Sequence, residues 1–172
     1  EAAGLGNESY RKGDLEQASR FFALSLAYNA AADNRAGLAE SYNSLGKVHL
    51  ARGANDDAVR HFSQALRIAR DIGDGALAAK AENNLGEAAF ARGEFAPALE
   101  LFVKAEAGKG LTDGERAEEL HNQGAALRRL GRPSEAEPRL LEALAINRRE
   151  KIWAEAASNY YVLASLEAER GA

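Results

Sequence analysis

The sequence predicts an all-α fold in which pairs of antiparallel helices stack into an elongated solenoid of about nine helices. The first observation behind this prediction is a glycine that returns at a nearly fixed interval. The spacings are 40, 40, 38 and 40 residues, and the positions are Gly13, Gly53, Gly93, Gly131 and Gly171. Self-similarity of this period is typical of repeat proteins, in which each unit contacts only its neighbours.

The second observation is that the same residue types recur around each glycine. A leucine and a small residue stand eight and seven places before it, as Leu5-Gly6, Leu45-Gly46, Leu85-Gly86 and Leu163-Ala164, with Gln123-Gly124 as the deviation. Alanine follows the glycine by five places, at Ala18, Ala58, Ala98 and Ala136. A large apolar residue follows by nine, at Phe22, Phe62, Phe102 and Leu140.

Helical periodicity explains these offsets. Between Ala39 and Arg52, apolar or small residues fall three and four places apart, which predicts an amphipathic helix that ends at Gly53. A second helix follows directly, with Ala58 and Phe62 on its apolar stripe. Small residues at Gly46 and Ala58 allow two helix axes to approach closely. A leucine in place of Gly86, an equivalent position, should therefore destabilise the fold severely.

Helix starts divide the chain into units. Asp33 or Asn34, Asp74, and the Thr112 to Glu115 capping box signal new helices, while Gly108-Lys109-Gly110 predicts a loop where the spacing shortens to 38. The predicted units are residues 1–33, 34–73, 74–111 and 112–151, followed by a half unit at 152–172. We treat them as a single domain, 1–172.

Composition excludes several classes of function. With 22 basic and 26 acidic residues the net charge is −4, which argues against binding nucleic acid or anionic lipid. The chain has no cysteine and no apolar run of the roughly 20 residues that cross a bilayer. We expect a soluble chain, in the cytoplasm, or in the periplasm if a signal or lipobox has been removed.

No pattern of catalytic or metal-binding residues is present. His49, His61 and His121 fall at unrelated offsets without zinc-binding spacing, and we expect His49 and His61 to pack in helix interfaces. The serines lack a nucleophile elbow and Gly108-Lys109-Gly110 lacks the order of a phosphate loop. We therefore expect no enzyme activity, no metal and no cofactor.

The offsets resemble those of the tetratricopeptide repeat, whose pattern is a leucine, a small residue, a turn glycine, then alanine, an aromatic residue and alanine. The period of about 40 is similar to the repeats of kinesin light chains and spindle-orientation adaptors, and many bacterial scaffold proteins share it. The resemblance implies a right-handed superhelix that binds an extended peptide of a partner protein. In that family the first helix of each unit lines a concave groove, and asparagines there hold the main chain of the peptide.

Residues thirteen, ten, six, three and two places before each glycine share one face of the first helix, because these steps are three or four apart. We predict this face, with the residue nine before, as the groove. Its candidate residues are Asn43, Lys47, Leu50, Lys80, Asn83, Asn84, Glu87, Phe90, His121, Asn122, Arg128 and Tyr161. Apolar Leu50 and Phe90, followed by basic Arg128, would suit a partner that is apolar at one end and acidic at the other.

Alternatives stay open at this stage. The asparagines can instead form a solvated polar face, and the arginines near residues 128–139 can pair with Glu135 and Glu137. By the same resemblance, Lys47 and Asn84 could imitate a clamp for a terminal carboxylate. The chain could instead be a regulatory sensor for a small signalling peptide or molecule. It could also be an assembly subunit, a homo-oligomer that self-associates through Trp153 near its C-terminal end.

Overall fold

The computed structural model describes residues 1–108 and 110–171, with every side chain there except that of Arg170. Lys109, in the middle of the predicted loop, lies outside the described residues. Within the described part the chain forms nine helices and no strand, which confirms the all-α prediction. The helices are α1 (Ala2–Arg11), α2 (Leu15–Ala31), α3 (Arg35–Ala51), α4 (Asn55–Asp71), α5 (Gly75–Ala91), α6 (Phe95–Glu106), α7 (Asp113–Arg129), α8 (Pro133–Arg149) and α9 (Trp153–Arg170).

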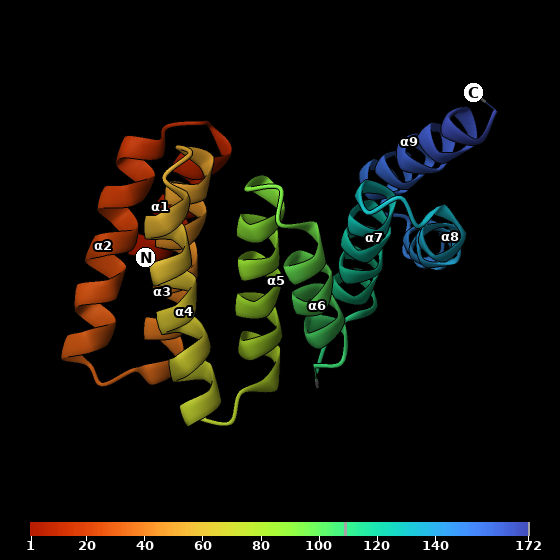
Figure 1. The fold of residues 1–172 in the computed structure, drawn as a ribbon. Helices are drawn as coiled ribbons and strands as arrows, with labels where there is room; N and C mark the ends of the chain where they lie inside the picture. The colour runs from red at the N-terminus through yellow and green to blue at the C-terminus, as the bar shows by residue number, and fades with distance from the viewer. Residues whose placement is uncertain (109, 172) are drawn as a thin grey trace.

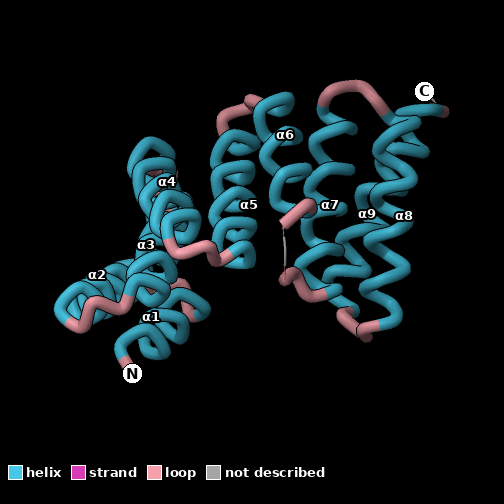
Figure 2. Tube along the Cα trace, turned by 90° about the horizontal axis from the view of Figure 1, so that it is seen from below, coloured by secondary structure: helices cyan, strands magenta, loops and turns pink. Residues whose placement is uncertain are grey.

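Each helix packs antiparallel against the one before it, so the chain forms a stack of helix pairs that ends with α9 (Figure 1). The turns α5–α6 and α7–α8 lie at one edge of the stack, and the connections α6–α7 and α8–α9 lie at the opposite edge (Figure 2). In addition, α3 lies directly against α5 and α7 against α9. The odd-numbered helices therefore form one layer of the solenoid and the even-numbered helices form the other.

The turn glycines behave as the sequence predicts within each pair. Gly13, Gly53, Gly93 and Gly131 have φ values of 79, 74, 80 and 70°, in the left-handed region that a residue without Cβ enters freely. Gly171, the fifth glycine of the series, ends α9 at φ −91° and is an exception. A second left-handed residue recurs twenty places after the turn glycine, between pairs. It is Asp33, Gly73 or Lys151, with φ values of 51, 71 and 60°.

Side-chain caps begin several of the helices. The predicted caps of α3 and α5 are confirmed: Asn34 accepts a hydrogen bond from the Gly37 N–H, and Asp74 accepts one from the Leu77 N–H. The predicted capping box of α7 is also confirmed, because the Thr112 hydroxyl accepts from the Glu115 N–H while the Glu115 carboxylate accepts from the Thr112 N–H. These caps fix where α3, α5 and α7 start.

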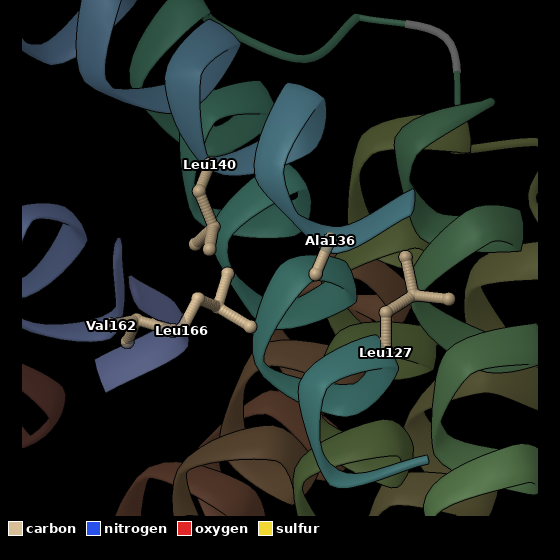
Figure 3. Packing of buried hydrophobic residues seen from close by; sticks show 5 residues of the cluster. All are labelled: Leu127, Ala136, Leu140, Val162 and Leu166. Carbon is tan, nitrogen blue, oxygen red and sulfur yellow. The ribbon is translucent and has the colours of Figure 1, made fainter. Parts of the chain in front are cut away.

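The core consists of repeated contacts between the two helices of a pair. A Cβ added to Gly86 on α5 would lie 2.5 Å from the Cε1 atom of the Phe102 ring on α6, so only glycine fits. The same contact occurs in the other pairs, as Gly6–Phe22, Gly46–Phe62 and Gly124–Leu140. The last α7–α8 pair is joined to α9 through a cluster of Leu127, Ala136, Leu140, Val162 and Leu166 (Figure 3).

The close approach at Gly86 generates a prediction about stability. We expect Gly86→Leu to lower the free energy of unfolding by about 3 kcal/mol, because the new side chain must displace the Phe102 ring from a packed interface. Urea denaturation followed by circular dichroism measures this. Gly4→Leu is the matched control, since a Cβ at Gly4, also in a helix, would meet nothing within 4 Å. Equal losses in the two variants would contradict the packing described here.

Candidate binding groove

Polar side chains connect neighbouring odd-numbered helices across the repeat boundaries. The Asn84 amide on α5 donates to Asn43 Oδ1 on α3 at 3.2 Å, and the Asn122 amide on α7 donates to Asn83 Oδ1 on α5 at 2.9 Å. His121 Nδ1 on α7 lies 2.7 Å from Asn159 Oδ1 on α9. We call these three contacts the polar rungs. They hold in register the helices that line the predicted groove.

Most asparagines of the rungs are buried, with exposed fractions of 3% for Asn43, 5% for Asn83 and 0% for Asn84, whereas Asn122 is half-buried. Their amides bond to one another, and losing one partner of such a pair costs about 1–3 kcal/mol. At the first rung, Asn43 Nδ2 and Asn84 Oδ1 have no hydrogen-bond partner within the described residues. One donor and one acceptor are therefore left over at the base of the groove.

A pocket of about 970 Å³ opens beside this first rung, between α1, α2 and α3, with Lys80 of α5 at its rim. We call it the groove pocket. Three predicted residues meet there, namely Asn43, Lys47 and Lys80. The other walls are partly apolar and come from Leu5, Phe21, Leu24 and Tyr28; the last two are 58% and 72% exposed. The pocket thus combines a buried amide, two ammonium groups, the carboxylates of Glu1 and Glu40, and an apolar wall.

The charges along the groove alternate in sign. Neither Lys47 nor Lys80 forms an ion pair within the described residues, so both ammonium groups are available to a ligand. Burial raises the pKa of Glu87, while the charge of Lys47 acts in the opposite direction. Glu118 accepts a hydrogen bond from the Asn83 amide at 3.4 Å. The groove pocket therefore carries both signs, since Glu1 and Glu40 line it together with Lys47 and Lys80, and further carboxylates follow along the stack.

Glu119 on α7 is a buried carboxyl group that the sequence did not single out. It is 4% exposed, and its Oε2 has no hydrogen-bond partner among the described residues. Burial, reinforced by the neighbouring carboxylates of Glu118 and Glu87, raises the pKa of Glu119 to about 9. Glu119 is therefore protonated and neutral at pH 7.

The remaining candidate residues lie apart from the groove pocket. Leu50 and Phe90 are half-buried and pack against interior clusters. Arg128 on α7 pairs with Glu169 on α9 at 2.9 Å, and Tyr161 on α9 is 73% exposed. Trp153, at the start of α9, is 63% exposed. The groove pocket therefore lies at the N-terminal end of the predicted face, and the candidate residues on α7 and α9 lie outside it.

Sequence reasoning missed a polar network in the wall of the groove pocket. The Asn29 amide donates to Ser41 Oγ at 3.1 Å, Ser41 Oγ lies 3.1 Å from Ser25 Oγ, and the Asn34 amide donates to Asn29 Oδ1 at 3.0 Å. Ser25 stands twelve places after Gly13, at the position where the other units carry the small residues Ala65, Ala105 and Ala143. One signal in the sequence could have revealed the network. Asn29 and Asn147 both stand sixteen places after a turn glycine, and both are buried polar residues.

The two interfacial histidines lie where the sequence predicts them. The rings of His49 on α3 and His61 on α4 stack with centroids 5.0 Å apart, and both residues are half-buried. Across the described residues, no group of three or more histidine, aspartate or glutamate side chains could hold a metal ion. Within the same part of the chain, no helix is both long and apolar enough to span a bilayer.

The buried Glu119 makes stability depend on pH. Between its ordinary pKa of 4.5 and its folded value of about 9, the folded protein keeps a proton that the unfolded chain releases. Glu119 therefore costs no stability below about pH 4.5, and stability falls by about 1.4 kcal/mol per pH unit as pH rises toward 9. We expect Glu119→Gln to remove this slope in urea denaturation from pH 5 to 8. The exposed control Glu100→Gln should keep it, and equal slopes in the two variants would contradict the assignment.

Comparison with solved structures places the fold among known helical repeats. The Rap conjugation gene regulator of plasmid pLS20, solved with the Phr* peptide, superposes with a TM-score of 0.92 at 19% identity, over 97% of this chain and 46% of that one. A Rap protein complexed with Competence and Sporulation Factor gives 0.84 at 17% identity, over 99% and 48%. This chain thus spans about half the length of the Rap proteins that it matches.

A kinesin light chain-like repeat protein of Podosopora anserina gives a TM-score of 0.76 at 19% identity, over 99% of this chain and 85% of that one. No curated protein matches the chain by sequence. The tetratricopeptide repeat pattern, in contrast, is matched over residues 3–71, 52–109 and 117–150, which is more than half of the chain. The chain therefore belongs to the tetratricopeptide repeat family.

Proposed function

We propose that this chain is a non-catalytic scaffold that holds an extended segment of a partner protein along its layer of odd-numbered helices. The observation that carries the proposal is the groove pocket. Asn43, Lys47 and Lys80, three groups chosen from the sequence as peptide contacts, line one cavity of about 970 Å³. Domains of this family typically bind proteins or peptides, which supports the same function.

The walls of the groove pocket define the chemistry of the bound segment. Lys47 and Lys80 favour a carboxylate, while Leu24 and Tyr28 offer exposed apolar surface to a neighbouring side chain. Asn43 Nδ2 has no hydrogen-bond partner among the described residues but is buried, so the lysines and the apolar wall are the groups that a segment contacts. A segment that combines an acidic and an apolar residue satisfies both.

The asparagines and the lysines of the predicted groove have different roles in this proposal. Asn83 and Asn84 are buried in the polar rungs, so their substitution would disturb helix register as well as binding. Lys47 and Lys80 make no ion pair among the described residues and can be replaced with less effect on the fold. A test of binding should therefore use the lysines, and the asparagines serve as a separate test of stability.

A regulatory sensor is the second candidate function, favoured by the likeness to Rap proteins, two of which were solved with a bound peptide or factor. A sensor needs a joint whose geometry a ligand can shift. The joint we propose is α5–α7: these helices contact each other less than α3 and α5 do, and the glycine spacing there is 38 instead of 40. Self-association through the exposed Trp153 is a third proposal.

The scaffold function predicts the outcome of a peptide-display selection on the purified chain. We expect enriched peptides to carry acidic and apolar residues, and the double variant Lys47→Glu/Lys80→Glu to bind them at least about tenfold more weakly, since two charge-assisted contacts become repulsive. Lys104→Glu is the matched control, because Lys104 is an exposed lysine on α6 outside the groove pocket. If no peptides are enriched, or if the double variant binds them as tightly as the native chain does, the groove pocket is not the binding site.

The sensor function predicts a change of shape in solution. If a selected peptide shifts the α5–α7 joint, small-angle scattering should show a change in radius of gyration when the peptide is added at saturating concentration. A rigid scaffold should bind the same peptide with an unchanged scattering profile. If the peptide binds and the scattering profile changes, the sensor function is supported. If the peptide binds and the profile stays the same, the scaffold function is supported.

A further inference from the structure

A second hollow lies on the other layer of the solenoid. It has a volume of about 510 Å³ and is formed by α6, α7 and α8, with none of the residues that line the groove pocket. We call it the outer cleft. Its floor is apolar: Leu99 and Leu127 belong to the edge of the core cluster that joins α7, α8 and α9, and Val103 beside them is 46% exposed. Figure 3 shows Leu127 on the side of that cluster away from Val162.

The outer cleft contains the one position where the repeat pattern departs from leucine. Gln123 stands where Leu5, Leu45, Leu85 and Leu163 stand in the other units, and it is 1% exposed. Its Nε2 donates both to the Phe102 carbonyl, at 3.4 Å, and to Glu106 Oε2, at 3.0 Å. Both amide hydrogens are thus used, and no described residue donates to Oε1. A buried amide in place of an apolar core residue leaves an acceptor at this cleft.

A second acceptor comes from the backbone of α8. Pro138 lies inside this helix and has no N–H, so the carbonyl of Ser134, four residues earlier, loses its usual helical donor. Both Ser134 and Pro138 line the outer cleft. Gln123 and Ser134 therefore present two acceptors to the same space, and a ligand with main-chain N–H groups satisfies both.

The charges at the rim leave one cation unpaired. Arg132 pairs with Glu135 at 2.7 Å, and Glu142 pairs with Arg116 at 2.7 Å. Arg139, which also lines the outer cleft, forms no ion pair within the described residues. Complementarity at this rim therefore calls for an acidic group on the ligand.

We propose that the outer cleft is a second binding site, separate from the groove pocket, for a short segment of a partner protein that carries a large apolar side chain next to an acidic one. The apolar side chain packs on Leu99, Val103 and Leu127, and the acidic group pairs with Arg139. Main-chain N–H groups of the segment donate to Gln123 Oε1 and the Ser134 carbonyl. The chain can then hold two segments at once, one on each layer.

The test uses the whole chain, labelled for NMR, with acetyl-Phe-Glu-amide as the probe. We expect saturable shifts at the Val103 and Leu127 methyl groups and at the Gln123 side-chain amide, with affinity in the millimolar range for so small a ligand. Acetyl-Ala-Glu-amide and acetyl-Phe-Gln-amide, which lack one feature each, should bind more weakly. Lys47→Glu/Lys80→Glu should leave these shifts unchanged, which distinguishes the outer cleft from the groove pocket.

Variants of the chain test the roles of single groups. Arg139→Gln should weaken binding about two- to fivefold, as for a partly exposed ion pair, whereas Arg148→Gln, an exposed arginine of the same helix outside the cleft, should not. Gln123→Leu restores the residue of the other units, so it should fold and yet lose affinity. The proposal is overturned if no saturable shift occurs at about 10 mM probe or if Arg139→Gln matches its control. Shifts that instead grow with protein concentration alone would overturn it in favour of a second copy of the chain.

Discussion

The contact between a glycine on the odd-numbered helix and a large apolar side chain on the even-numbered helix sets the dimensions of the whole stack. At Gly86 the ring of Phe102 occupies the space that a Cβ would need, and the equivalent contact recurs in each of the four pairs. Because one pair then presents the same surface to the next, the odd-numbered helices come close enough for the polar rungs to form. The depth of the groove pocket and the position of its lysines follow from that spacing.

Stability and recognition use different residues on the same helix face. The rung asparagines satisfy one another across repeat boundaries, whereas Lys47 and Lys80, one helical turn or less away, have no such role. Buried polar pairs of this kind are costly to break and therefore fix register. Charged groups beside them can vary without disturbing the fold, so one backbone can serve several ligands.

Much of this structure could be predicted from the sequence, because glycine, alanine and phenylalanine mark positions where sterics leave little choice. The left-handed turn at Gly53 and the capping box at Thr112 were both predictable. The second left-handed turn was hidden, since Asp33 and Lys151 occupy it in place of glycine. The groove pocket was predicted only in part. Its lysines follow from periodicity, but Leu24 and Tyr28 come from an even-numbered helix, and their exposure depends on how three helices meet.

The polar rungs also make the units unequal. Only the third unit carries asparagine at both the tenth and the ninth position before its turn glycine, as Asn83 and Asn84, and it bonds to Asn43 on one side and to Asn122 on the other. The fourth unit connects in both directions with a different pair, His121 to Asn159 and Asn122 to Asn83, whereas the second unit contributes Asn43 to one rung. The side chains of the polar rungs therefore determine which unit can stand next to which, although the backbones of the units are nearly alike. Shuffling, duplicating or deleting a unit would preserve the helix pairs. It would still place buried amides opposite residues that cannot form a hydrogen bond with them.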